Sequence, residues 1–314
     1  MKKWLQDKLS CPECPHTESR LELEIQAEQA DDVIEGQLTC LICGRRYPIH
    51  KGIAILLPEK SLPVLTESRG YNSKGMLSSY LWSHYGDLLH DPDATDAYKV
   101  WSSCFRNTDG GCALDIGCSV GRLSFEMTRT HANVIGMDTS ISFIQKAREL
   151  MNRKQLEFEM IIEGMITKKQ SCVFDNGWNY GNVDFIVADA LALPFPQHTF
   201  STVASVNILE KVPDPMLHLK GVNRVLKNQN GMFVFSDPFS WDEAFVDPER
   251  WLSGKAEGRY ACRGAETMAR IFAGEDGIFD PPLKVIAKQD VSWKIRKTEN
   301  LWEHIHSQMM IGKR

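Results

Sequence analysis

The chain has 314 residues and a net charge of −5 at pH 7, with 43% apolar and 25% charged residues. This length predicts a large α/β domain with a smaller appendage, and the apolar fraction excludes a disordered chain. No stretch approaches the ~20 apolar residues of a membrane-spanning helix, and no apolar run follows the lysines near the start. We therefore expect a cytoplasmic protein that makes no membrane contact.

The nine cysteines fall into two groups. Two matched C-x-x-C pairs lie in the first 60 residues, and the other five cysteines are scattered singly. Each pair can deliver two thiolates to one side of a tetrahedral Zn²⁺ ion. Because the protein would supply all four ligands, we expect a closed, structural zinc site in a reducing compartment. The predicted ligands are Cys11, Cys14, Cys40 and Cys43.

Residues 1–60 are predicted to form a zinc-ribbon domain. Apolar and polar residues alternate between the two cysteine pairs, which indicates short strands. The run CGRRYPIHKGIAILLPE at 43–59 resembles the short zinc-ribbon proteins that activate methyltransferases acting on tRNA and translation factors. The resemblance covers about 50 residues. It implies that the ribbon stabilises a catalytic partner or presents its substrate.

The remaining chain divides into a connector and a larger domain. Residues 61–110 are rich in aromatics without strand alternation, and we expect helices that cap the cofactor site. In residues 111–314, short apolar runs alternate with helix-like segments, which predicts an α/β fold with a doubly wound, mostly parallel sheet. Residues from about 151 to 180 are predicted to form an insertion. Residues 283–297 are predicted to form two strands, and residues 299–310 a closing helix.

A glycine-containing turn follows the first apolar run of this domain, in the sequence ALDIGCSVG. A dinucleotide site needs three glycines in G-x-G-x-x-G for close approach to a pyrophosphate. Here Ser119 stands between Gly117 and Gly121. Asp115 suits the ammonium and sulfonium end of S-adenosylmethionine (SAM), which carries no phosphate, and would repel a pyrophosphate. The turn therefore favours SAM over a dinucleotide.

Two further acids end the next apolar runs. Asp138 can accept hydrogen bonds from the ribose hydroxyls, and Asp189 can accept from the adenine amino group. Asn207 follows the fourth run and would line the floor beneath the methyl group. This order resembles the class I SAM methyltransferases, which implies a Rossmann-like sheet of seven strands. The predicted cofactor residues are Asp115, Gly117, Cys118, Gly121, Asp138, Thr139, Asp189, Ala190 and Asn207.

A closer resemblance covers most of residues 80–255. The turn DIGCSVGRLSFEM, the segment WSHYGD and the stretch SDPFSWDEAFVDPERWLSG resemble the C-terminal methyltransferase domain of ovothiol synthase, which N-methylates the imidazole of mercaptohistidine. The resemblance implies that Tyr85, Trp241 and Trp251 face the substrate. Tyr85, Asp237 and Glu243 are candidates to orient the acceptor or take its proton. The predicted catalytic set is Tyr85, Asp237 and Trp241.

Three functions are compatible with these patterns. The first is N-methylation of a small histidine-like or thiol-imidazole molecule. The second is methylation of an rRNA or tRNA base, because rRNA guanine methyltransferases also place a four-cysteine ribbon before a SAM domain. Residues 1–60 hold eight Lys or Arg and ten Asp or Glu, a net charge of −2, which matches a phosphate backbone poorly. The third is a non-catalytic SAM-binding scaffold.

Overall fold

The computed structural model describes residues 1–314 except 15–18, 67–69, 109 and 175–176. The N-terminal ribbon consists of a short 3₁₀ helix followed by four antiparallel strands. Their buried residues alternate with exposed ones along β2 and β3, as expected for strands with one face on a core. The ribbon elements are η1 (Lys3–Lys8), β1 (Leu21–Gln29), β2 (Asp32–Cys40), β3 (Arg46–His50) and β4 (Ile53–Leu56).

Ribbon and catalytic domain share one sheet. Strand β4 pairs in parallel with β9, where Ile55 lies opposite Val187 and Leu56 opposite Ala188. The result is an eleven-stranded sheet with the order β1-β2-β3-β4-β9-β6-β5-β10-β11-β13-β12. The sheet is thus larger than the predicted seven strands, because the strands of the ribbon extend it. The domain strands are β5 (Cys112–Ile116), β6 (Asn133–Asp138), β9 (Val183–Ala188), β10 (Thr202–Val206), β11 (Met232–Asp237), β12 (Lys284–Arg296) and β13 (Trp302–Lys313).

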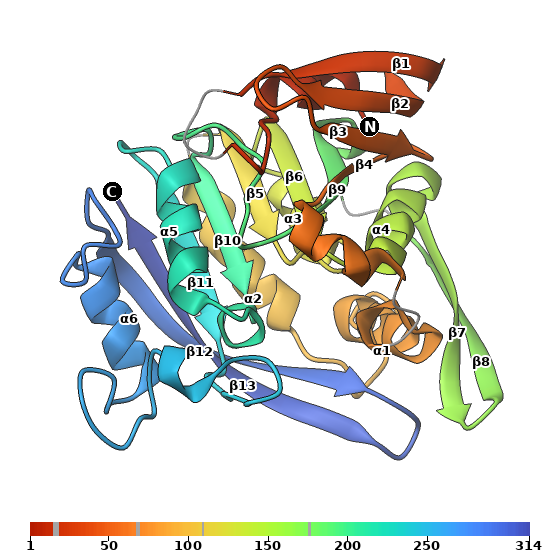
Figure 1. Ribbon diagram of the computed structural model, residues 1–314. Coiled ribbons are helices and arrows are strands. Elements are labelled where there is room, and N and C mark those ends of the chain that lie inside the picture. Colours follow the sequence, from red (N-terminus) through yellow and green to blue (C-terminus); the bar gives the residue numbers. More distant parts are fainter. Residues whose placement is uncertain (15–18, 67–69, 109, 175–176) are drawn as a thin grey trace.

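Helices cover both faces of this sheet (Figure 1). Helices α1 to α4 belong to one apolar cluster, and α5 and α6 to another on the opposite side. Their bounds are α1 (Lys74–Tyr85), α2 (Ala97–Ser103), α3 (Arg122–Met127), α4 (Ile141–Arg153), α5 (Pro215–Val225) and α6 (Gly264–Phe272). In the part of the chain that the structure describes, no helix has the length and apolarity needed to cross a bilayer.

Short 3₁₀ helices join these elements. The connector contains η2 (Glu59–Thr66), η3 (Gly70–Asn72) and η4 (Cys104–Asn107), and later loops contain η5 (Tyr180–Asn182), η6 (Leu209–Lys211) and η7 (Pro248–Arg250). The predicted insertion contains a hairpin of β7 (Gln155–Glu163) and β8 (Ile166–Val173), which projects beside α1 (Figure 1). The hydroxyl of Ser78 in α1 donates to the carbonyl of Glu159 at 3.1 Å, so the hairpin buttresses the connector.

Two predictions for the C-terminal segment are wrong. Residues 283–297, predicted as two strands, contain the single long strand β12. The predicted closing helix at 299–310 is instead the start of strand β13, which lies between β11 and β12. Pairing with two neighbours satisfies the backbone of β13 on both sides, and this tertiary pairing overrides a composition that suits a helix.

A buried arginine links the ribbon to the catalytic domain. Arg148 of α4, 4% exposed, binds Asp184 of β9 with one nitrogen and Asp32 of β2 with another. Asp184 is fully buried and also accepts a hydrogen bond from the backbone of Lys2 at 2.6 Å. The Arg148 guanidinium and the N-terminal ammonium of Met1, which lies 2.8 Å from Asp32 Oδ1, together balance the two carboxylates. Removing Arg148 therefore leaves an uncompensated charge on the fully buried Asp184.

We predict that Arg148→Met lowers the free energy of unfolding by about 3–5 kcal/mol, because the Asp184 carboxylate would remain buried without its cation. Urea denaturation measures this loss. Arg153→Ala on the same helix is the control, since Arg153 is 58% exposed in its pair with Glu149 and should change stability by less than about 0.5 kcal/mol. A loss below about 1 kcal/mol for Arg148→Met would contradict the assignment.

Candidate functional site

The four ribbon cysteines converge on one point. Their Sγ atoms all lie within 4.8 Å of one another, and those of Cys11 and Cys43 are 3.7 Å apart. A tetrahedral zinc ion with Zn–S bonds of ~2.3 Å requires S···S separations of about 3.8 Å. The residues therefore fit Zn²⁺ without rearrangement of the backbone. With four protein thiolates, the shell has no open position for a substrate or water.

The surroundings of these cysteines also suit thiolates. The Ile42 N–H group points at Cys40 Sγ at 3.4 Å, and the Tyr47 hydroxyl lies 3.0 Å from Cys11 Sγ. Gly44 adopts φ +71°, the left-handed conformation that closes the second knuckle. Burial raises the pKa of the Cys11 thiol to about 11, so this site needs a metal ion to hold the thiolate form.

The turn between β5 and α3 requires its two glycines. The Gly117 and Cys118 N–H groups both donate to the Met137 carbonyl, at 2.8 and 2.9 Å. Gly117 has φ +72°, and a Cβ atom there would lie 2.0 Å from Ile208 Cδ1. Gly121 has φ +85° at the start of α3. The turn thus packs directly against the loop after β10.

Acidic side chains flank this turn. Asp115 accepts a hydrogen bond from the Ser124 hydroxyl at 2.6 Å, and burial raises its pKa to about 7. Asp138 accepts from the backbone of Ser119 at 3.0 Å and of Ser140 at 2.8 Å, and burial raises its pKa to about 6. The Ser119 hydroxyl has no partner among the described residues. Two buried acids with elevated pKa values favour a cationic ligand, which would restore their charged form.

The third acid lies one strand further along. Asp189 follows β9 and accepts from the Leu191 N–H group at 2.8 Å and from the Ser61 hydroxyl at 2.6 Å. Ala190 adjoins it, and Thr139 adjoins the second acid at the start of α4. All three acids therefore end parallel neighbours of one sheet, at its carboxyl edge, where doubly wound folds bind nucleotides.

Asn207, the residue predicted at the floor, has a strained backbone. Its φ is +57°, its N–H group donates to the Ser236 carbonyl, and its side-chain oxygen accepts from the Ser307 hydroxyl at 2.7 Å. Ser307 belongs to β13, the strand that was predicted as a helix. Hydrogen bonds from two neighbouring strands therefore hold Asn207 in this strained conformation, as is typical of functional loops.

A buried pair of carboxyl groups lies beside this floor. Asp237 ends β11 with no exposed surface, and its Oδ1 accepts from the Phe239 N–H group at 2.9 Å. Its Oδ2 has no partner among the described residues. Burial, followed by the Glu210 carboxyl, raises the pKa of Asp237 to about 8. Glu210 accepts from the Ser240 hydroxyl at 2.7 Å and pairs with Lys211 at 3.0 Å, so both of its oxygens are engaged. The backbone N–H groups of Leu209 and Glu210 face the Asp237 carboxyl and favour its charged form, which limits the rise of its pKa.

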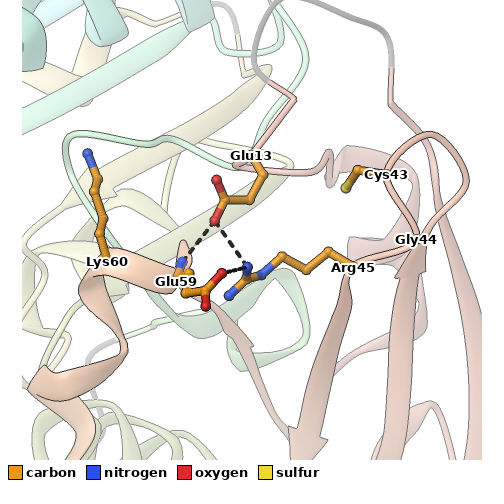
Figure 2. A pocket seen from close by; sticks show the side chains of 6 residues that line it. All are labelled: Glu13, Cys43, Gly44, Arg45, Glu59 and Lys60. Atoms are coloured by element: carbon orange, nitrogen blue, oxygen red, sulfur yellow. Dashed lines mark hydrogen bonds and ion pairs between the residues drawn. The ribbon is translucent and has the colours of Figure 1, made fainter.

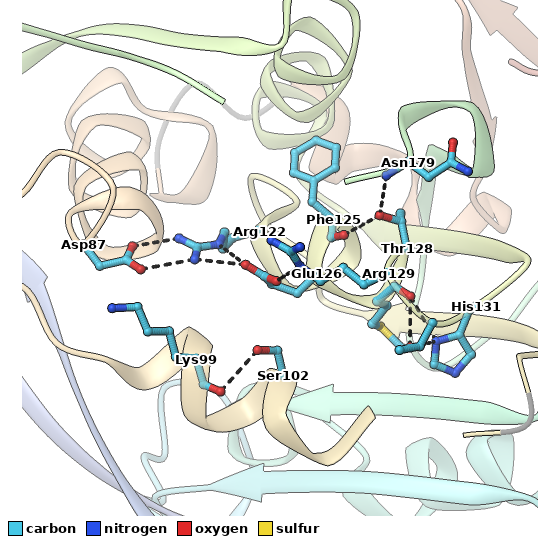
Figure 3. A network of polar contacts seen from close by, with 12 residues as sticks. Asp87, Lys99, Ser102, Arg122, Phe125, Glu126, Thr128, Arg129, His131 and Asn179 are labelled. Carbon is cyan, nitrogen blue, oxygen red and sulfur yellow. Dashed lines mark hydrogen bonds and ion pairs between the residues drawn. The ribbon is translucent and has the colours of Figure 1, made fainter. Parts of the chain in front are cut away.

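Tyr85 lies behind the glycine turn. Its hydroxyl donates to the Val120 carbonyl at 2.8 Å, and its ring is fully buried. Beside it, Arg122 holds Asp87 with two nitrogens and also binds Glu126 (Figure 3). The ion pairs of Arg122 connect the connector to α3. The Tyr85 hydroxyl supports the glycine turn through its hydrogen bond to the backbone.

The two tryptophans predicted to face the substrate lie together after β11. The rings of Trp241 and Trp251 are stacked, with centroids 6.2 Å apart and planes 15° from parallel. The Trp241 indole donates to the Ser253 hydroxyl at 2.8 Å, and the Trp251 indole to the Val246 carbonyl at 2.9 Å. Both are partly exposed, so the stacked pair forms a surface on the loop that follows Asp237.

Sequence reasoning missed His84, which lies among the aromatic side chains of the connector. The His84 ring lies 4.5 Å from that of Tyr98 and 5.8 Å from that of Tyr80. Burial and then the Arg122 charge keep the pKa of His84 well below its usual range, and its Nδ1 has no partner in the described part of the chain. His84 belongs to the segment WSHYGD, but the sequence alone cannot show that its ring is buried between Tyr80 and Tyr98.

Comparisons with known proteins agree with this geometry. Residues 114–235 match the family model described as a methyltransferase domain, and residues 5–52 match that of Trm112p-like proteins. One similar protein is a ubiquinone/menaquinone biosynthesis C-methyltransferase of Marinomonas sp., 25% identical over 60% of this chain and 66% of that protein. The protein of the same description from Teredinibacter turnerae is 34% identical over 59% of this chain and 65% of its own. The chain thus spans less than two thirds of these relatives.

Among solved structures, the complex between the Haloferax volcanii Trm112 methyltransferase activator and a methyltransferase matches with a TM-score of 0.44 and 16% identity, over 75% of this chain and 95% of that one. A TM-score this low carries no weight for function. The two family matches confirm the predicted methyltransferase domain with SAM as its cofactor, and the predicted zinc ribbon. The chain joins a SAM-dependent methyltransferase domain to a Trm112p-like zinc domain.

We predict that the purified protein holds about one zinc ion per chain and that Cys40→Ser loses most of it, because structural zinc binding and folding of the ribbon are coupled. Metal analysis and the thermal midpoint give the readouts, and both should fall. Cys172→Ser is the matched control, since Cys172 lies on β8 outside the cluster. Full zinc content in Cys40→Ser would contradict the four-cysteine site.

Proposed function

We propose that this protein transfers a methyl group from SAM to a ring nitrogen of a small histidine-like or thiol-imidazole molecule. The observation that carries the proposal is the unpartnered Oδ2 of Asp237, fully buried at the carboxyl end of β11. A buried acceptor atom without a donor costs free energy, and an imidazole N–H group supplies that donor. The resemblance of residues 236–254 to an imidazole N-methyltransferase supports the same acceptor.

We assign the predicted cofactor residues to the carboxyl edge of the sheet, and their positions at the ends of β5, β6 and β9 support this assignment. Asp115 and the backbone of Gly117 and Gly121 hold the amino acid end, with Cys118 buried in the same turn. The remaining cofactor contacts are assigned to the ribose and the adenine, and to the floor beneath the methyl group. They are Asp138 and Thr139 for the ribose, Asp189 and Ala190 for the adenine, and Asn207 for the floor.

Bound SAM supplies a methyl group that its sulfonium already activates, so the chain's own residues mainly align and dehydrate the acceptor. Asp237 accepts a hydrogen bond from one imidazole nitrogen, which leaves the lone pair of the other nitrogen free for attack. As the N–C bond forms and the C–S bond breaks, the imidazole N–H proton passes to the Asp237 carboxylate. The stacked Trp241 forms part of the approach to this site, whereas Tyr85 acts through the turn.

The relatives favour a second candidate acceptor. Their names describe C-methyltransferases of quinone biosynthesis, which act on an aromatic ring carbon. In that chemistry, Asp237 would accept the proton of a phenolic hydroxyl group instead of an N–H proton. The same buried carboxylate can thus serve both acceptor classes, and the acceptor must be identified by assay.

The other two candidates have less support. A nucleic-acid substrate would meet a ribbon with a net charge of −2, from eight basic and ten acidic residues in 1–60. Such a surface gives little electrostatic affinity for phosphates. A scaffold without activity would leave no reason for the unpartnered Oδ2 of Asp237 beside the predicted floor of the cofactor site.

The experiment that tests the proposal incubates the zinc-loaded protein with methyl-labelled SAM and four acceptor classes. These are histidine derivatives, thiol-imidazoles, quinols and structured RNA. We expect label in the first two classes and formation of S-adenosylhomocysteine in equal amount. Label in quinol alone would select the second candidate, label in RNA with steeply salt-dependent binding would overturn the small-molecule acceptor, and SAM binding without transfer would indicate a scaffold.

For Asp237, we predict a pH profile with a definite sign. Its raised pKa of about 8 means that the carboxylate form grows as the pH rises toward 8. We expect kcat/KM for SAM, which reports the free enzyme, to rise about tenfold per pH unit below 8 and then to level off. Asp237→Asn should lower kcat about 100-fold or more and should remove this rise of kcat/KM with pH, the rising limb of the profile.

The control for this profile is Glu243→Gln. Glu243 was a candidate for the same role, but its side chain is exposed on the loop after β11, so the variant should keep both the rate and its rise with pH. An imidazole acceptor titrates near pH 6.5 on its own, so a limb at that pH should persist in Asp237→Asn. A wild-type limb near pH 8 that survives in Asp237→Asn would exclude Asp237 as its source.

A further inference from the structure

The segment that leaves the ribbon contacts the cofactor edge directly. After β4, the chain enters η2 at Glu59, and two residues later the Ser61 hydroxyl donates to Asp189 Oδ2 at 2.6 Å. The other oxygen of Asp189 accepts from the Leu191 N–H group at 2.8 Å. Both oxygens of the carboxylate are therefore fixed, one by its own loop and one by the ribbon's exit segment.

The start of η2 is in turn held by the two cysteine knuckles. Glu13 lies between Cys11 and Cys14, and its Oε1 accepts from the Glu59 N–H group at 2.8 Å. Arg45 follows the second knuckle and binds the Glu59 carboxylate at 2.9 Å and that of Glu13 at 3.5 Å. Figure 2 shows these three side chains converging beside Cys43. Each knuckle thus contributes one charged side chain to the position of Glu59.

We propose that this chain of contacts couples the zinc site to the cofactor site, with Ser61 as a positioning residue for the Asp189 carboxylate. Zinc fixes the knuckles, Glu13 and Arg45 fix Glu59, and Ser61 then holds Asp189 in one orientation. The inference rests on the proposed role of Asp189 at the adenine. It adds that a residue outside the methyltransferase domain match, Ser61, sets cofactor affinity, and that zinc and cofactor bind cooperatively.

The lone pairs of Asp189 leave room for this role. Each carboxylate oxygen can accept about two hydrogen bonds, and each oxygen of Asp189 accepts one from the protein. One position per oxygen remains for a ligand amino group. A carboxylate already held by the protein loses less conformational freedom when it binds, which favours affinity. Alternatively, the Ser61 hydroxyl could occupy the position of the ligand's amino group. In that case, removing the hydroxyl would make the ligand bind more tightly.

The test measures binding of S-adenosylhomocysteine to the full-length, zinc-loaded protein by calorimetry. We expect Ser61→Ala to weaken binding about three- to tenfold and Ser61→Thr, which keeps the hydroxyl, to restore it. Arg45→Ala should weaken binding in the same direction. The matched control is Arg46→Ala, because the neighbouring Arg46 is exposed and should leave binding unchanged. The thermal midpoint without ligand should be the same for Ser61→Ala and wild type.

Coupling is reciprocal, so the cofactor product should also affect zinc. We expect S-adenosylhomocysteine to lower the fraction of zinc that a chromogenic chelator removes at equilibrium from the wild type, and to have a smaller effect in Ser61→Ala. Unchanged or tighter binding in Ser61→Ala would overturn the inference. If Asp189→Ala loses affinity while Ser61→Ala does not, the proposed cofactor site stands without the coupling, and if Asp189→Ala also binds normally, the adenine assignment itself fails.

Discussion

The parallel pairing of β4 with β9 is the contact on which the rest of the molecule depends. Through it, the ribbon continues the catalytic sheet, and the two parts share one apolar cluster. The edge of β9, which would otherwise expose unpaired backbone groups, is covered by the ribbon. The same pairing delivers the chain to the carboxyl edge at Leu57, next to the loop that carries Asp189. The pairing of β4 with β9 therefore determines the position at which the connector begins.

The second constraint is the burial of acids at that edge. Asp115, Asp138 and Asp237 all have pKa values raised chiefly by loss of water, so burial favours the neutral form of each carboxyl group. A sulfonium and an ammonium bring positive charge to the same edge and favour the ionised forms. The site is thus electrostatically complementary to its cofactor, and a cationic ligand regains free energy that folding spent on burying these groups.

The parts of the site that could be predicted from sequence are those set by local spacing. The cysteine knuckles, the glycine turn and the three strand-end acids each depend on a few neighbouring residues and on strand order. Strand β13 could not be found in this way, because its Glu, His, Gln and Met residues suit a helix and its strand state depends on pairing with β11 and β12. His84 could not be found either, because one sequence cannot show that its ring is buried among the aromatic side chains of the connector.

The contacts of the connector were beyond sequence reasoning for a related reason. Ser61 and Asp189 are 128 positions apart, and Glu13 and Glu59 are 46 apart, so no periodic pattern links them. These contacts exist because the fusion places the ribbon's exit above the cofactor edge. A separate zinc protein would pay an entropic cost of association before it could make such contacts, whereas a ribbon on the same chain makes them within one molecule. Fusion thus allows a few weak polar contacts to influence the cofactor site.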